Sequence, residues 1–216
     1  MKLARFEFNF FGVNTYVAWC SDTHEAAIID PGMMSAAEQQ RLDEYIRSND
    51  LKITHLLNTH LHIDHALGNG YISDRYSVDT EAHTADAGLG VSIAEQAAMF
   101  HLPIATPAPV TISTPLSDND RITLGNEYFD VIHIPGHTQG SVAFYNPTDG
   151  FLMSGDALFH ESIGRTDLPG GNHTQLLTSI NTRLLTLPPQ TIVYPGHGPE
   201  TNVEHETKYN PWLKKH

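Results

Sequence analysis

The chain is poor in cysteine, in basic side chains and in long apolar runs. Its single cysteine, Cys20, excludes a disulfide within the chain and a zinc site built from several thiolates. Twelve Lys and Arg stand against 25 Asp and Glu, and the resulting formal charge of −13 disfavours binding to nucleic acid, because phosphate groups require clustered cations. No segment approaches the roughly 20 apolar residues of a membrane span, and Glu7 and Asn9 interrupt any signal-peptide core. We therefore expect a protein of the bacterial cytoplasm without a nucleic-acid or membrane partner.

Apolar periodicity predicts a mixture of strands and helices. Helices are predicted to begin after Ser35 and Ser92, each followed three residues later by a glutamate as in a capping box, and after Asn172. Each half of the chain contains its own set of strands, so we expect an α+β fold of two mixed sheets covered by helices, in one domain over residues 1–216. Strands are predicted at 2–9, 13–20, 26–29, 53–57, 121–123, 128–134, 141–145, 151–154 and 191–194. A connecting loop is predicted at 102–117, with its part 103–109 at the surface.

Histidine, by contrast, is abundant, with 14 copies in 216 residues. Four potential metal ligands fall within the six residues His-Leu-His-Ile-Asp-His, which follow one of the predicted strands and a short polar segment. Imidazole nitrogens and carboxylate oxygens both bind borderline divalent metals. In an extended loop His60 and His62 project to the same side, because side chains alternate with a period of two. Asp64 and His65 follow where the chain turns toward a helix, so they can face an adjacent ion.

Three further ligand candidates each follow an apolar run that predicts a strand. They are His137 in Pro-Gly-His-Thr, Asp156 in Ser-Gly-Asp and His197 in Pro-Gly-His-Gly. A glycine precedes each of them and permits a tight turn. A single histidine after a strand is more often an ordinary loop residue than a ligand. Combined with the first motif, however, the three complete a site at one edge of the sheets.

In this order, the four motifs resemble those of the metallo-β-lactamase superfamily over nearly the whole chain. The resemblance implies an αββα sandwich with two divalent metal ions at the edge between its sheets. Zinc is the expected metal, and iron or manganese are alternatives. Asp30 is implied to support the site without being a ligand. The implied ligands are His60, His62 and His137 for the first ion, Asp64, His65 and His197 for the second, and Asp156 bridging the two with a hydroxide between them.

Such a ligand set is chemically consistent with hydrolysis. Two metal ions lower the pKa of bound water, so that hydroxide is available near neutral pH, and one ion can polarise a substrate carbonyl. Asp64 is the predicted catalytic side chain, because it can place the nucleophile or take up a proton. No Ser-His or Cys-His pair is needed, and Cys20 is expected in the core.

Two further segments narrow the resemblance. Gly-Arg-Thr-Asp at Arg165 and the closing Asn-Pro-Trp-Leu resemble small glyoxalase-II-like bacterial hydrolases, which implies a thioester of the hydroxyacylglutathione type as a small-molecule substrate. Only about 19 residues follow His197, too few for the helical region that binds glutathione in full glyoxalase II enzymes. β-Lactamases of the superfamily usually lack an aspartate at the place of Asp156, so antibiotic hydrolysis is not expected.

Two other activities remain open at this point. The Gly-Arg-Thr-Asp segment also resembles persulfide dioxygenases, in which a single iron would be held here by His60, His137 and Asp156. A lactone hydrolase would use the same seven ligands as the thioesterase.

The segments after Asp156 also contain candidates for contact with substrate. Phe159, His160 and Arg165 are the candidates, and Arg165 has two interpretations: it binds a substrate carboxylate, or it pairs with Asp167 and braces the loop. The helix predicted over residues 93–100 is expected to pack in the core, with a lid over an acyl group as the alternative.

Overall fold

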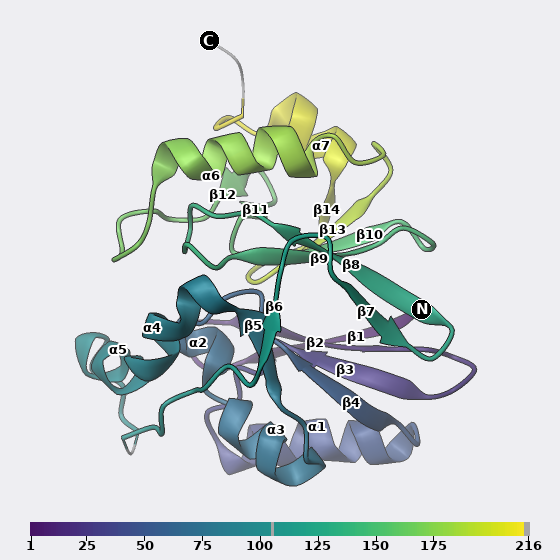
Figure 1. Cartoon of the computed structure of the whole chain (residues 1–216), viewed down its shortest axis with the longest axis vertical. Helices are drawn as coiled ribbons and strands as arrows, with labels where there is room; N and C mark the ends of the chain where they lie inside the picture. The colour runs from purple at the N-terminus through teal and green to yellow at the C-terminus, as the bar shows by residue number, and fades with distance from the viewer. Residues whose placement is uncertain (105, 214–216) are drawn as a thin grey trace.

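The computed structural model describes residues 1–104 and 106–213, in which two six-stranded sheets pack face to face (Figure 1). The first sheet comes from the first half of the chain and runs in chain order. The second comes from the second half, in the order β14-β13-β10-β9-β8-β7. The first sheet contains β1 (Lys2–Phe8), β2 (Val13–Trp19), β3 (Glu25–Ile29), β4 (Lys52–Leu57), β5 (Thr80–His83) and β6 (Thr114–Leu116). The second contains β7 (Arg121–Leu124), β8 (Glu127–His133), β9 (Val142–Asn146), β10 (Phe151–Gly155), β13 (Ile192–Pro195) and β14 (Thr201–Asn202).

Both sheets are mixed. In the first, β3, β4, β5 and β6 pair in parallel, and the remaining pairs are antiparallel. In the second, only the β10–β13 pair is parallel. The expected α+β fold with one mixed sheet from each half is therefore confirmed.

Helices cover the outer face of each sheet, which completes the αββα layering (Figure 1). On the first sheet lie α1 (Ala36–Ser48) and α3 (Asn69–Tyr76), and on the second α6 (His173–Ser179) with its π-helical continuation Ile180–Leu184 and α7 (Val203–Tyr209). The predicted capping box of α1 is confirmed, because the Ser35 hydroxyl accepts from the Glu38 amide at 3.3 Å and the Ser35 amide donates back to the Glu38 carboxylate at 2.8 Å.

Strand β2 shows how the layers form. All seven of its side chains are buried, because it lies between β1 and β3 and both of its faces are covered. Side chains alternate between the faces of a strand. Tyr16 and Ala18 accordingly pack between the two sheets, whereas Val17 and Trp19 pack under the outer helices.

The segment between β4 and β7 departs most from the sequence prediction. It contains α2 (Ile63–Ala66), α3, β5, the 3₁₀ turn Thr84–Asp86, α4 (Ala87–Val91) and β6, none of which the periodicity indicated, as well as the predicted helix α5 (Ile93–Met99). The capping box predicted at Ser92 is wrong. The backbone there joins α4 directly to α5, and the Ser92 hydroxyl donates to the carbonyl of Leu89 at 3.1 Å rather than capping α5.

The hairpin of β11 (Leu158–Phe159) and β12 (Ser162–Ile163) was also not predicted. Cys20 is fully buried, as expected. Among the described residues no helix has the length and apolarity to cross a membrane.

Candidate metal centre

The seven predicted ligands meet where strands of both sheets end, at one edge of the sandwich. In the first half, β4 leads into a loop and then into α2. In the second half, β8, β10 and β13 each end shortly before one ligand. The first segment carries His60, His62, Asp64 and His65, and the three strand ends carry His137, Asp156 and His197.

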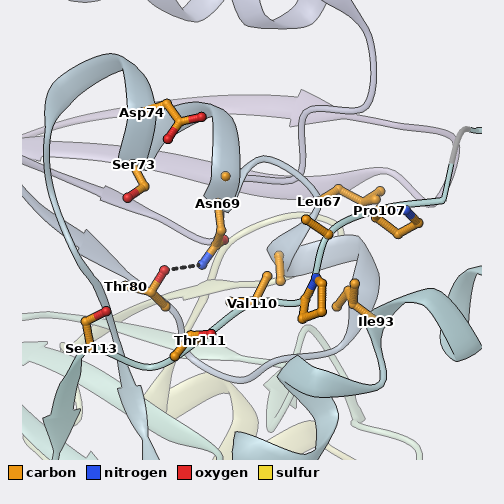
Figure 2. Close-up of a pocket in the computed structure, with 14 residues that line it drawn as sticks. Leu67, Asn69, Ser73, Asp74, Thr80, Ile93, Pro107, Val110, Thr111 and Ser113 are labelled. Carbon is orange, nitrogen blue, oxygen red and sulfur yellow. Dashed lines mark hydrogen bonds between the residues drawn. The ribbon is translucent and has the colours of Figure 1, made fainter.

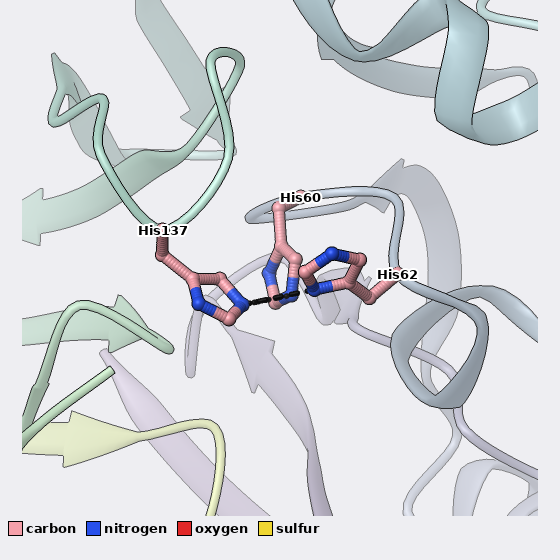
Figure 3. A group of neighbouring side chains, drawn as sticks. All are labelled: His60, His62 and His137. Carbon is pink, nitrogen blue, oxygen red and sulfur yellow. Dashed lines mark hydrogen bonds between the residues drawn. The ribbon is translucent and has the colours of Figure 1, made fainter. Parts of the chain in front are cut away.

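Three buried imidazoles form the first group. Figure 3 shows the rings of His60, His62 and His137 turned toward one another. His137 Nε2 lies 2.9 Å from His62 Nδ1 and 3.2 Å from His60 Nε2. His137 Nδ1 donates to the carbonyl of Arg165 at 2.7 Å, which leaves the lone pair on Nε2 facing the group. Three converging imidazole nitrogens are the ligand arrangement of a zinc-type site.

A second group is formed by Asp64, His65 and His197. Asp64 Oδ2 lies 3.1 Å from His197 Nε2 and 3.7 Å from His65 Nε2. The other ring nitrogens face protein acceptors: His197 Nδ1 donates to the carbonyl of Phe11 at 3.1 Å, and His65 Nδ1 lies 3.0 Å from the Asp30 carboxylate. Such outer contacts orient a metal-binding imidazole.

Asp156 lies between the two groups. Its Oδ1 is 3.3 Å from His65 Nε2, and its Oδ2 is 3.6 Å from His197 Nε2 and 3.8 Å from His137 Nε2. Asp156 Oδ1 and His65 Nε2 are buried without a hydrogen-bond partner. Buried polar atoms are rarely left unpaired in folded proteins. The residues therefore fit two divalent cations, with Asp156 shared between them.

The charges of the protein groups favour cations at this position. Burial lowers the pKa of His60 well below its ordinary range and that of His62 to about 3, so both rings are neutral. Burial alone would also lower the pKa of His65, but Asp156 and the other nearby carboxylates raise it well above its ordinary value. Burial would raise the pKa of Asp156, yet the charge of His65 lowers it overall. The site thus combines the neutral rings of His60 and His62 with ionised carboxylates around a protonated His65, whose proton a bound cation would displace.

Two buried carboxylates hold the ligand loops in place. Asp30 accepts from both the amide and the hydroxyl of Thr59 at 2.7 Å, which agrees with its expected supporting position. Asp86 accepts from the Leu61 amide at 3.2 Å, from the Thr138 hydroxyl at 2.8 Å and from the Gly140 amide at 2.7 Å. It therefore joins the His60–His62 loop to the His137 loop. Sequence reasoning missed Asp86, because no motif surrounds it.

Glycine is required at two turns beside the ligands. Gly155 has φ +50° and precedes Asp156, and a Cβ there would overlap the side chain of Thr59. A Cβ on Gly196 would overlap the Asp156 carboxylate and lie 2.7 Å from the ring of His65. The two strand ends approach the ligands this closely only because neither residue has a side chain.

A cleft of about 180 Å³ opens onto the ligands. Arg165 lines it, together with Phe11, Phe100, Leu168 and five of the ligands. The Arg165 guanidinium makes two hydrogen bonds of 2.7 Å to Asp167, the geometry of the bracing interpretation.

The other two substrate candidates lie farther from this cleft. The ring of Phe159 packs 6.4 Å from that of His197, at the edge of the site. His160 lies outside the cleft, where its ring stacks 4.9 Å from His205 of α7. His160, Glu161 and His205 form a separate, partly exposed group on the surface.

A larger cavity, of about 350 Å³, lies behind α2 and contains none of the predicted site residues (Figure 2). Asn69 of α3 forms part of its wall and donates to the Thr80 hydroxyl at 3.1 Å and to the Asn58 side chain at 2.6 Å. Asn58 in turn donates to the carbonyl of His65 at 2.9 Å. This wall therefore supports α2 and its two ligands from behind.

Comparison with known proteins agrees with this geometry. The model of the metallo-beta-lactamase superfamily matches residues 8–197. The chain belongs to the metallo-β-lactamase superfamily. Hydroxyacylglutathione hydrolase GloC of Haemophilus influenzae is 35% identical over 210 residues, covering 94% of this chain and 93% of that protein. Probable metallo-hydrolase YqgX of Bacillus subtilis is 34% identical over 219 residues, covering 99% and 98%. The chain is thus a hydrolase of a metal-binding superfamily.

Solved structures of the superfamily share the fold over the whole chain. The B3 metallo-β-lactamase BLEG-1 superposes with a TM-score of 0.88 at 35% identity, covering 99% of this chain and 100% of that one. TTHA1623 in a di-iron-bound form has a TM-score of 0.86 at 33% identity, with 97% and 100% coverage. ETHE1 from Myxococcus xanthus has a TM-score of 0.77 at 27% identity, with 98% and 84% coverage. Because one of these neighbours is a β-lactamase, the argument from Asp156 against β-lactam hydrolysis stays a prediction.

Proposed function

We propose that this protein is a dinuclear metallohydrolase that cleaves small thioesters. The observation that carries the proposal is the position of Asp156 between two groups of three ligands, because this arrangement provides two adjacent cation positions with a shared carboxylate. The similarity to a hydroxyacylglutathione hydrolase supports thioesters as the substrate class. Zinc is the proposed metal, since imidazole and carboxylate ligands suit it, and the di-iron form of a similar structure makes iron the alternative.

The chain's own residues would have distinct roles in thioester hydrolysis. Two bound divalent ions would make hydroxide available near neutral pH and polarise the thioester carbonyl. Burial would raise the pKa of Asp64, but the charge of His65 lowers it overall, so Asp64 lines the cleft as an ionised carboxylate that would help hold the second ion and place the nucleophile. The rings of Phe11 and Phe100 meet edge to face at 5.7 Å and shield one side of the cleft from water.

A mononuclear iron dioxygenase is the second candidate. His60, His137 and Asp156, the three ligands it would use, lie together here, and a similar solved structure binds iron. This activity would leave the buried His65 without a role, although its Nε2 faces Asp156 and has no hydrogen-bond partner. The dinuclear hydrolase accounts for that residue and is therefore favoured.

We also propose that the protein acts on small molecules in the cytoplasm. The formal charge of −13 and the free, buried Cys20 support this location and the absence of a nucleic-acid partner.

The test combines metal analysis with matched variants. We expect about two equivalents of metal per chain and turnover of S-lactoyl and S-acetyl thioesters. His65→Ala should lose one equivalent and reduce turnover at least 100-fold, whereas His173→Ala, at the exposed start of α6, should change neither. One equivalent of iron, with oxygen uptake on a persulfide and unchanged activity in His65→Ala, would overturn the proposal. Turnover of a chromogenic cephalosporin in place of thioesters would overturn the substrate class.

A further inference from the structure

A second, apolar compartment of about 170 Å³ adjoins the metal cleft, and we call it the side slot. Its apolar walls come from α4, α5 and the loop before α6. The side slot and the metal cleft share three wall residues, His62, Phe100 and Leu168, so the two lie side by side. The apolar walls are Leu89, Met99, Phe100, Leu168 and Pro169.

The side slot has little hydrogen-bonding capacity inside. Gln96 and the proposed metal ligand His62 are the buried polar side chains in its wall. Both ends of the Gln96 amide are already used, because Oε1 accepts from the Ile63 amide at 3.0 Å and Nε2 donates to the Leu89 carbonyl at 3.0 Å, and His62 Nδ1 lies 2.9 Å from His137 Nε2. The Ser92 hydroxyl also donates to Leu89, at 3.1 Å. A polar group entering the slot would lose its hydrogen bonds to water without replacing them, at a cost of a few kcal/mol, whereas an apolar group would be stabilised there.

Helix α5 both packs in the core and forms a wall of the slot. Ile93 and Ala97 are buried, which confirms the packing expected from the sequence. Met99 is nevertheless 56% exposed at the end of the helix, and Phe100 stands against Phe11 at the junction of the slot and the metal cleft. Core packing therefore does not account for the side chain of Met99, whereas Phe100 packs against this core and lines the slot as well.

The charge of the residues that line the side slot indicates which part of a thioester it would bind, the acyl group or the thiol moiety. Among the residues that line it, Glu95 carries the only formal charge, and Lys and Arg are absent. A thiol moiety with carboxylates, such as glutathione, would meet this glutamate without a cation to pair with. The acyl side of a substrate has no such conflict.

We propose that the side slot binds the unbranched, saturated acyl chain of the substrate, with the thioester carbonyl at the metal ligands. This inference rests on the proposed thioester hydrolysis. At roughly 30 Å³ per water-sized group, 170 Å³ holds about five such groups, so chains of about five or six carbons fill the slot. Longer simple acyl groups are therefore better substrates than lactoyl.

The expected size of the preference follows from the burial of methylene groups. Each buried CH₂ contributes about 0.8 kcal/mol, which corresponds to about a fourfold increase in kcat/KM. The increase should continue for each added carbon until the slot is full, and then stop. From acetyl to hexanoyl the total gain is on the order of 100-fold.

The test measures kcat/KM for acyl chains from two to ten carbons on one small, uncharged thiol, with the metal-loaded full chain. Leu89→Phe and Ser92→Phe each place a ring in the slot and should lower the hexanoyl-to-acetyl ratio at least tenfold. Val91→Phe lies on the same helix, 66% exposed and outside the slot, and should leave the ratio unchanged. Thermal unfolding of each variant shows whether it is folded.

The outcomes separate this inference from the proposed function. A value of kcat/KM that does not change with chain length in the unmodified protein would overturn acyl binding in the side slot. An unchanged hexanoyl-to-acetyl ratio in both folded slot variants would do the same, and neither result would contradict the proposed hydrolase activity. If no thioester of any length is turned over by protein with two metals bound, the proposed function fails and the acyl assignment fails with it.

Discussion

Asp86 should contribute to metal binding although it is not one of the proposed ligands. It accepts three hydrogen bonds, from the Leu61 amide, the Thr138 hydroxyl and the Gly140 amide. Leu61 stands between the two histidines of the first loop, and Thr138 directly follows His137. Two variants separate the effects: Asp86→Ala removes all three acceptor contacts, and Asp86→Asn keeps the shape but replaces one oxygen with an NH₂ donor.

The magnitudes follow from the three donors. In Asp86→Asn the remaining oxygen can still accept from Gly140, and the new NH₂ can donate to Thr138, so the buried Leu61 amide is left unpaired, at a cost of about 1–3 kcal/mol. Asp86→Ala leaves both amides unpaired and adds a small cavity, so we expect a loss of about 3–5 kcal/mol. Burial raises the pKa of Asp86, because desolvation disfavours its ionised carboxylate. Removing the carboxylate also removes this unfavourable desolvation, so the loss of unfolding free energy in Asp86→Ala should lie toward the lower end of the range.

Urea unfolding of the metal-free chain measures the loss in stability, and competition with a chelator measures metal affinity. Both variants should bind metal at least tenfold more weakly, because the two ligand loops are no longer joined. The reasoning would be refuted if Asp86→Ala lost less than about 0.5 kcal/mol or kept its full metal affinity. A matched control is Asp74→Ala on α3, which lies outside the metal centre.

Three further outcomes are expected. Gly164→Ala should reduce metal content and thioester turnover, because its Cβ would overlap the carbonyl of Asp156. Gly70→Ala is its control, because a Cβ there meets open space in α3, and it should raise the free energy of unfolding in urea by up to about 1 kcal/mol. Burial would lower the pKa of His55, but Glu81 at 2.6 Å raises it overall. The stabilisation by this pair should be complete below pH 6.5 and decline as pH rises through the raised pKa of His55. In urea titrations the free energy of unfolding should therefore fall less between pH 6 and pH 9 in His55→Gln than in the unmodified chain. Chelation should lower the melting temperature, because metal at 1,000 times its Kd stabilises the folded state by about 4 kcal/mol, and an unchanged melting temperature would contradict bound metal in the folded protein.

The strands and the position of the ligands could be predicted because both depend on local patterns. Alternation of apolar side chains marks β2 and its neighbours, and a fixed spacing places His60 and His62 on one side of a loop. The helices and strands that lie between β4 and β7 are three to eight residues long. Except in the predicted helix α5, too few turns or alternations repeat in them for a period to be recognised. Several of them, α2, β5, α4 and α5, pack instead around Leu61 and Ile63.

Predictions based on proximity in sequence were less reliable than those based on spacing. Phe159 and His160 are neighbours three and four residues beyond Asp156, and both were expected near substrate. Phe159 ends β11 and packs against His197, whereas His160 lies in the turn of the hairpin and stacks on His205 of α7. Asp86 was missed for the opposite reason, because its three partners are 25 to 54 residues away and no local pattern connects them.

Each proposed ion takes two ligands from the first loop and one from the second half of the chain, so the metal centre requires the two sheets to be held in register. The backbone provides this directly at the site: the Val142 amide donates to the Thr59 carbonyl at 2.8 Å, and the Asn14 amide donates to the Gly196 carbonyl at 2.7 Å. Both bonds join one half to the other within one residue of a ligand. Together with Asp86 they fix the ligand loops before an ion arrives, so metal binding would not have to order these loops.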